Sequence, residues 1–378
     1  MSTLRALLSA LLVCSCADDA WRVEVRGSGG SAGTSGGGSA GTSGGGSAGT
    51  SGGGSAGTSG GGSAGASGAP LTCPDRKVST LAGSSAGFKE GSAGPNGIAL
   101  LDGVHGLAAF STVSAFVADT NNQRIRNLLF DGGDCEVWAG SGVSGFSDGA
   151  AETAQLAAPE GVAVSAAGVV HFADTQNHAI RRVVNGSVET LAGDGSSGFM
   201  DEPDPRFNQP TGLAVDGSGV VFVADRGNHA IRKLTPNGLV ITLAGDGSPS
   251  MADGAGASAR FDAPWAIAVD PSGVLWISDT GNDRVRRLDT SGNVSTFAGG
   301  DGTLKAPMGI AVDDFGNVYV ADSGHQRVLR FAPSGSPETL AGADAAFSAL
   351  TGLALAKAYA GGGLLVGDGH RVRLVHCP

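Results

Sequence analysis

The sequence predicts an all-β protein, because short apolar strands recur along most of its length. Six of these strands end in Asp, and successive Asp anchors lie 55, 51, 54, 43 and 46 residues apart. Self-similarity at such a period, in units rich in Val and Ile, is typical of propellers and solenoids. The anchors are Asp119, Asp174, Asp225, Asp279, Asp322 and Asp368.

Each repeat unit contains four strand-like runs. In the third copy they read GLAVD, VVFVAD, AIRKL and VITLAG, and Gly, Asp and Asn separate them. Short runs of this composition between turn residues are typical of antiparallel strands. Four strands per unit and six units predict a six-bladed β-propeller of four-stranded antiparallel blades over residues 71–378.

The two ends of the repeat region predict how the ring closes. The region begins with KVSTLAG, a fourth strand with no blade before it, and it ends with HRVRLVH, a third strand with none after it. The N-terminal strand is therefore predicted to complete the last blade, which removes two exposed sheet edges. In this register Cys73 and Cys377 fall at the same corner and are expected to form a disulfide. Cys135 aligns with buried Val positions and is expected to be a free, buried thiol.

Further motifs surround the anchors. Four copies carry a block such as PTGLAVD or PMGIAVD upstream, and five carry a turn and strand such as DTNNQRIR downstream. Over residues 77–377 these blocks resemble NHL repeats, although the fifth copy has His325 where the motif has Asn. The resemblance implies a six-bladed propeller. Related propellers include amidating lyases, lactonases, gluconolactonase-like enzymes and non-catalytic scaffolds, so the fold does not select a function.

The N-terminal fifth of the chain differs in composition. Residues 1–16 contain one basic residue, an eight-residue apolar run and the ending V-C-S-C, which resembles a bacterial lipobox with Cys16 as the lipidated residue. A plain secretory signal is the alternative. Residues 17–70 are dominated by the octad SAGTSGGG, which lacks charge and large apolar side chains and is predicted to be a disordered tether. These features predict a protein anchored in the bacterial cell envelope, at the outer membrane or cell surface, or otherwise secreted.

The charge of the protein restricts its partners. Lys and Arg total 24 against 35 Asp and Glu, which gives a formal net charge of −11. Charges within residues 1–70 cancel, so the excess lies on the propeller. An acidic body argues against nucleic-acid binding, which needs a surface that neutralises phosphates. The only predicted membrane contact is the lipid anchor.

Residues that recur in every blade are expected to serve the fold. Each Asp anchor ends the second strand of its blade, and Asn follows three residues later in four copies, so these side chains are expected to bond the backbone and fix the turn. The Arg seven residues after most anchors is expected to point toward adjacent loops or acids. Histidines at this turn occur one per blade, too far apart to share a metal ion.

Residues that differ between blades are the candidate binding site. The position before the Gly or Ala that opens each innermost strand varies, and the six side chains there are expected to line one mouth of the central channel. A mixture of polar and apolar groups suits a small pocket, and drift at an unconstrained rim would produce a similar mixture. The six candidates are His105, Glu160, Thr211, Trp265, Met308 and Thr351.

This ring offers weak support for an enzyme. A zinc site would need about three histidines, and the ring contains one, His105. A calcium site would need several carboxylate and amide oxygens, and only Glu160 in the ring fits. The sequence therefore predicts no catalytic residues, metal or cofactor. It favours a scaffold that binds a protein, peptide or glycan, with a hydrolase or lyase at the channel mouth as the alternative.

The connections between blades differ in length. Four of them span 17 to 21 residues, and the last two span 8. The long connections are expected to wall one face over blades 1 to 4 and to contribute to recognition. Alternatively they pack across neighbouring blades, because three of them share a G-F-x-[DE] motif.

Overall fold

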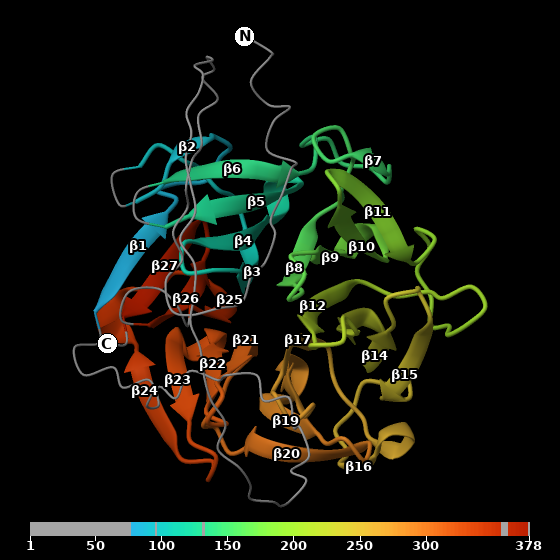
Figure 1. Ribbon diagram of the computed structural model, residues 1–378. Helices are drawn as coiled ribbons and strands as arrows, with labels where there is room; N and C mark the ends of the chain where they lie inside the picture. Colours follow the sequence, from blue (N-terminus) through green and yellow to red (C-terminus); the bar gives the residue numbers. More distant parts are fainter. Residues whose placement is uncertain (1–76, 95–96, 131–132, 357–361, 377–378) are drawn as a thin grey trace, which may run out of the picture. The chain divides into compact units, whose positions relative to one another are not determined.

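The computed structural model describes residues 77–94, 97–130, 133–356 and 362–376. These residues form six β-sheets arranged in a ring around a central axis, which confirms the six-bladed propeller (Figure 1). The signal peptide, the tether and the predicted roles of Cys16, Cys73 and Cys377 lie outside the described residues. None of the short helices in the described part of the protein has the length and apolar character that a membrane span requires.

Each blade has four main antiparallel strands, from an innermost strand at the axis to an outermost strand at the rim. The innermost are β3 (Val104–Ala109), β8 (Pro159–Val164), β12 (Pro210–Val215), β17 (Pro264–Val269), β21 (Pro307–Val312) and β25 (Leu350–Leu355). The second are β4 (Ser114–Asp119), β9 (Val170–Asp174), β13 (Val221–Asp225), β18 (Leu275–Asp279), β22 (Val318–Asp322) and β26 (Gly363–Asp368). The third are β5 (Arg124–Leu129), β10 (Ala179–Val184), β14 (Ala230–Leu234), β19 (Arg284–Leu288), β23 (Arg327–Phe331) and β27 (Arg371–His376). The outermost are β6 (Asp134–Ala139), β11 (Ser187–Ala192), β15 (Val240–Ala244), β20 (Asn293–Gly299), β24 (Pro337–Ala341) and β1 (Val78–Ala82).

The predicted ring closure is confirmed. Strand β1, from the start of the described residues, pairs antiparallel with β27, from their end, and Val78 lies opposite Val375 (Figure 1). The sixth blade therefore has the order β1, β27, β26, β25. One blade thus contains strands from both ends of the propeller.

Both faces of the second strand of each blade are buried, because every blade packs between two neighbours. All five residues of β13 are buried. Phe116 of blade 1 packs in one apolar cluster with Phe172 and Val162 of blade 2. Second strands therefore form nearly continuous apolar runs, and the Asp that ends each one is also buried.

The innermost strands approach one another closely at the axis. A Cβ atom on Gly161 would lie 1.9 Å from the carbonyl oxygen of Thr211, and one on Gly106 would lie 2.3 Å from that of Glu160. Five of the six innermost strands therefore carry glycine where they approach the next strand. Blade 4 differs, because Ala266 occupies the equivalent position.

The long connections pack against the blade that follows them, rather than across neighbouring blades. Three contain short strands that pair with the outermost strand of that blade: β2 (Gly91–Ser92) with β6, β7 (Gly149–Ala150) with β11, and β16 (Gly254–Ala255) with β20. These three sheets are therefore five-stranded.

Candidate functional site

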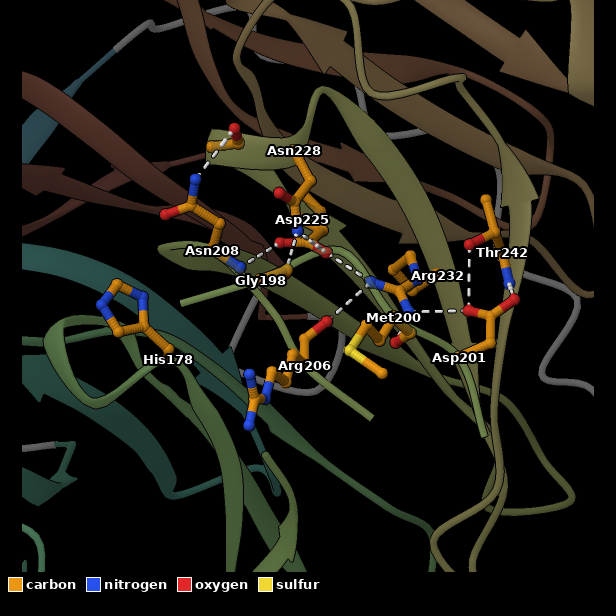
Figure 2. A network of polar contacts seen from close by, with 12 residues as sticks. His178, Gly198, Met200, Asp201, Arg206, Asn208, Asp225, Asn228, Arg232 and Thr242 are labelled. Atoms are coloured by element: carbon orange, nitrogen blue, oxygen red, sulfur yellow. Dashed lines mark hydrogen bonds and ion pairs between the residues drawn. The ribbon is translucent and has the colours of Figure 1, made fainter. Parts of the chain in front are cut away.

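A buried polar network recurs in the blades, and Figure 2 shows it in blade 3. One carboxylate oxygen of Asp225 accepts a hydrogen bond from the backbone N–H of Asn208 at 2.8 Å. The other accepts from the Asn228 amide at 2.8 Å and from the Arg232 guanidinium at 2.6 Å. Asp225 and Arg232 are fully buried. The network pairs each buried charge and therefore offers little to a ligand.

The same arginine holds the connection that precedes its blade. Arg232 donates to the backbone carbonyl of Met200 at 2.5 Å and to the Asp201 carboxylate at 2.7 Å. Asp201 in turn accepts from the backbone and hydroxyl of Thr242 in the outermost strand. The guanidinium carbon also lies 5.1 Å from the centre of the Phe199 ring, which belongs to the shared G-F motif. Equivalent buried pairs are Arg126–Asp119, Arg181–Asp174 and Arg286–Asp279, and a partly buried pair joins Arg373 to Asp368.

The anchors bond both the turn that follows them and the connection that precedes their blade. The carboxylate of Asp119 accepts from the side-chain amide of Asn122 in the following turn at 2.9 Å. It also accepts from the backbone N–H of Asp102, 17 residues earlier, at 2.7 Å. The amide of Asn122 likewise donates to the carbonyl of Gly87 at 2.7 Å. Asp119 and Arg126 project from the same face of paired strands, which places the carboxylate beside the guanidinium.

The variable ring surrounds a small cavity at the axis. Five of its six residues line this cavity, whose volume is about 50 Å³: His105, Glu160, Thr211, Trp265 and Thr351. Met308 is not among the lining residues; its backbone carbonyl accepts a hydrogen bond from the hydroxyl of Ser278. A cavity of this volume holds a few water molecules or one functional group, whereas pockets for drug-sized ligands usually reach about 300 Å³ or more.

Two polar residues of the ring are occupied by structural bonds. The Thr211 hydroxyl donates to the backbone carbonyl of Trp265 at 2.7 Å. The Thr351 hydroxyl donates to the carbonyl of Val104 in β3. Both therefore tie one innermost strand to the next.

Glu160 and His105, by contrast, each have a side-chain atom that lacks a hydrogen-bond partner. Oε2 of Glu160 and Nδ1 of His105 are buried without a hydrogen-bond partner, and His105 Nδ1 lies 3.9 Å from the other carboxylate oxygen of Glu160. Burial raises the pKa of Glu160 to about 7. Burial also lowers the pKa of His105, and the positive charge of Arg226 acts in the same direction. Near neutral pH the pair therefore consists of a neutral imidazole and a carboxyl group that is partly protonated.

Arg226 is a site residue that the sequence interpretation missed. It lies in the short helix η3 (Arg226–Asn228), and its guanidinium carbon is 4.7 Å from the centre of the Trp265 ring. Trp265 in turn makes an edge contact with His105 at 6.0 Å between ring centres. The signal was present in the alignment of the repeats: the residue after the anchor is Thr, Thr, Arg, Thr, Ser and Gly in sequence order.

The site residues fit a metal ion poorly. Within the described residues no three side chains of His, Cys, Asp or Glu are arranged to hold a metal ion. In the part of the chain that the structure describes, Glu160 is the one carboxylate that lines the axial cavity, and the cationic Arg226 acts on it. A zinc site of three histidines or a calcium site of several oxygens is therefore not supported by these residues.

A second, wider depression lies on the outer side of blades 2 and 3. Its volume is about 760 Å³, and it is lined by the end of β11, residues 202–206 and residues 237–239. The charged residues there include Arg206, which pairs with Asp194 at 2.9 Å. Both side chains are substantially exposed, so this pair carries little specific binding energy.

Sequence comparison identifies three of the repeats. The family model of the NHL repeat matches residues 207–234, 261–288 and 304–331. The chain is 27% identical over 239 residues to the chloroplastic protein SUPPRESSOR OF QUENCHING 1 of Arabidopsis thaliana; the match covers 57% of this chain and 22% of that protein. It is 30% identical over 172 residues to Teneurin-m of Drosophila melanogaster, which covers 40% of this chain and 6% of that protein. The chain thus spans a small part of these relatives.

Solved structures share the architecture. A gluconolactonase from Xanthomonas campestris superposes with a TM-score of 0.58 at 17% identity, over 82% of this chain and 92% of that one. A chain from a nidogen/laminin complex superposes with a TM-score of 0.53 at 18% identity, over 70% and 90%. At these identities the likeness concerns the fold alone.

Proposed function

Because the protein is a six-bladed β-propeller built of NHL repeats, we propose that it is a non-catalytic scaffold that binds a protein, peptide or glycan partner at the mouth of its axis. One observation carries this proposal. The axial cavity has a volume of about 50 Å³, and two of the residues that line it, Glu160 and His105, have buried polar atoms without a hydrogen-bond partner. Such a site suits one group that projects from a large partner.

The rigidity of the ring supports the same function. Hydrogen bonds from Thr211 and Thr351 join neighbouring innermost strands, and glycines allow these strands to pack closely. A preorganised site loses little conformational entropy when it binds. The partner then supplies most of the contact area outside the cavity, on the face that carries the connections between blades.

A photo-crosslinking experiment in cells tests this assignment. A photoreactive amino acid at Met308, in the ring but outside the cavity lining, is expected to capture one defined partner from the native envelope. The control carries the same group at the exposed Ser291, in a turn on the opposite face. Equal labelling from both positions would contradict binding at the axial mouth.

A propeller hydrolase or lyase is the second candidate, and one observation favours it. A carboxyl group with a pKa of about 7 beside an imidazole is suited to general acid–base catalysis near neutral pH. Turnover of lactone or ester substrates by the purified protein, abolished by both Glu160→Gln and His105→Ala, would establish this function and refute the scaffold. The scaffold predicts no turnover that depends on either residue.

We also propose that a lipid on Cys16 holds the propeller at the bacterial envelope. The V-C-S-C sequence and the uncharged octads that follow it support this location. Cys16→Ser is expected to move the protein from the membrane fraction to the soluble fraction of the envelope. A wild-type protein already found in the soluble fraction would indicate simple secretion instead.

A further inference from the structure

Blade 3 departs from a bond that four other blades share. The residue after the anchor is Thr or Ser in those blades, and its hydroxyl donates to the carbonyl of the first residue in the next innermost strand. The four bonds are Thr120 to Pro159, Thr175 to Pro210, Thr280 to Pro307 and Ser323 to Leu350, at 2.6 to 2.8 Å. In blade 3 this position is Arg226, so an inter-blade bond has been replaced by a cation.

The cation lies near the axial cavity, where its charge acts on Glu160 and His105. The Arg226 guanidinium stacks over Trp265, and among the described residues it makes no ion pair with an Asp or Glu side chain. The buried arginines of the repeat are all paired, by contrast. An unpaired arginine beside a cavity is available for a ligand.

The buried atoms beside it also lack partners. Oε2 of Glu160 and Nδ1 of His105 form no hydrogen bond. A buried polar atom without a partner costs about 1 to 3 kcal/mol, so two in one cavity require an explanation. An entering group that bonds both atoms supplies one.

Charge and size restrict the group that fits. A cationic group would be repelled by the positive charge of Arg226. A neutral hydroxyl group would leave the guanidinium without a negatively charged partner. A carboxylate accepts from the fork of a guanidinium and from a protonated carboxyl or an imidazole N–H. A single carboxylate also suits a cavity of about 50 Å³.

We propose that the axial mouth binds one carboxylate presented by a partner protein, either an Asp or Glu side chain or the carboxylate at the partner's terminus, and that Arg226, Glu160 and His105 contact it. The proposal rests on the scaffold function, because it identifies the group that the partner inserts. Arg226 supplies charge, Glu160 a proton donor, and Trp265 the apolar wall that orients the guanidinium.

Binding is then coupled to proton uptake. The charged or titratable groups that act on Glu160 are His105 of β3 and Arg226 of η3; Thr211, Trp265 and Thr351 do not ionise in this range. A second carboxylate in the cavity raises the pKa of Glu160 above its value of about 7, because two adjacent carboxyl groups do not both ionise. Affinity is therefore expected to fall as the pH rises above 7.

Calorimetric titration of the full-length protein with defined peptides tests the proposal. Three probes are used: a peptide with blocked ends and one aspartate, the same peptide with asparagine, and a peptide whose one carboxylate is its free C-terminus. The first or the third is expected to bind, which distinguishes a side chain from a terminus, and the asparagine peptide is expected to bind at least about tenfold more weakly.

Two variants separate binding from folding. Arg226→Thr restores the residue of the other blades, so the fold is expected to be retained while carboxylate affinity falls about tenfold or more. Glu160→Gln keeps the size and a hydrogen-bond donor, so it is expected to bind the same probe but to lose the proton uptake near pH 7. Unchanged affinity in Arg226→Thr, or binding of the asparagine peptide as tight as that of both carboxylate peptides, would overturn the proposal.

The outcome also separates this proposal from the scaffold function. If no carboxylate probe binds while the group at Met308 still captures a partner, the scaffold remains and the carboxylate is wrong. If neither occurs, both are wrong.

Discussion

His171 occupies a position where every other blade has an aromatic or leucine side chain. It is buried, its Nδ1 has no hydrogen-bond partner, and it lies opposite Arg182 on the neighbouring strand. Burial lowers its pKa to about 4, and the charge of Arg182 adds to this shift. The other blades have Phe116, Phe222, Trp276, Tyr319 and Leu365 there.

Acid is therefore expected to weaken the fold through this residue. The pKa of His171 in the folded protein, about 4, lies below its ordinary value of 6.5, so its contribution is fully present above pH 6.5 and is lost as the pH falls toward 4. The full loss is about 3 kcal/mol. Urea unfolding across this range is expected to show a smaller decline for His171→Phe than for the wild type. His370→Phe, at an exposed position, is the control, and parallel curves for His171→Phe and the wild type would refute the prediction.

The roles of residues that recur in every blade could be predicted from the sequence better than the roles of residues that occur in one blade. The repeated Arg was expected to meet loops or acids, and Arg232 does both because its register places it beside a buried carboxylate. Arg226 could not be interpreted from spacing, because its importance depends on contacts with Trp265 in another blade. Satisfied hydrogen bonds, such as that of Thr211, are likewise invisible in the sequence.

The long connections form part of the blades they precede. Asp148 of one connection accepts from Arg181 at 2.6 Å and from the backbone and hydroxyl of Thr190 in the outermost strand at 2.9 and 3.0 Å. The shared G-F-x-[DE] motif favoured packing, whereas the length of the connections favoured recognition. What the motif could not reveal is that its acidic residue pairs with an arginine more than 30 residues later in the sequence.

Loss of this contact is expected to loosen the connection and destabilise blade 2. Asp148→Ala removes charged hydrogen bonds at a half-exposed carboxylate, which corresponds to about 1 to 2 kcal/mol. Amide hydrogen exchange should accelerate in residues 141–158 and leave the other connections unchanged. Asp204→Ala, at an exposed position in the connection before blade 3, is the matched control and is expected to change stability by less than about 0.5 kcal/mol. Equal stability of the two variants would contradict the assigned role.

The strand that closes the ring also makes the disulfide prediction specific. The backbone N–H of His376 donates to the carbonyl of Lys77 at 2.9 Å. His376 directly precedes Cys377 and Lys77 follows shortly after Cys73, so the chain segments that lead to the two cysteines lie side by side at these residues. Cys135 is buried and free, and burial raises the pKa of its thiol to about 11. Non-reducing mass spectrometry of exported protein is expected to find Cys73 linked to Cys377. This bond would close a loop of about 300 residues and contribute roughly 5 kcal/mol in the chain-entropy picture. A disulfide that includes Cys135 would refute it.

The glycines of the innermost strands determine how closely neighbouring blades pack around the axis. In Gly161→Ala the new Cβ would meet the carbonyl oxygen of Thr211 at 1.9 Å, so blades 2 and 3 must separate. We expect a loss of about 2 to 3 kcal/mol in urea unfolding. Ala266→Gly, at the equivalent position of blade 4, is the control and is expected to cost about 0.5 to 1 kcal/mol. Similar small losses in both variants would show that the axis tolerates expansion.

The six-bladed ring was predictable because every unit repeats the same strand pattern, and the orphan KVSTLAG strand left one place to fill. The size of the axial cavity was not predictable. It depends on how closely Gly106, Gly161 and their counterparts approach the next strand, a distance that no single repeat encodes.

The way β1 meets β27 determines how the ring responds to mechanical tension. Val78 begins β1 and His376 ends β27, and the two strands are antiparallel, so both strand ends nearest the termini lie at the same corner. A force that pulls these ends apart acts on the Lys77–His376 hydrogen bond first and then on each following bond in turn. Such peeling needs far less force than shearing all bonds together. A covalent link at that corner would carry the load instead, and the propeller would then withstand pulling that otherwise opens it at a single blade.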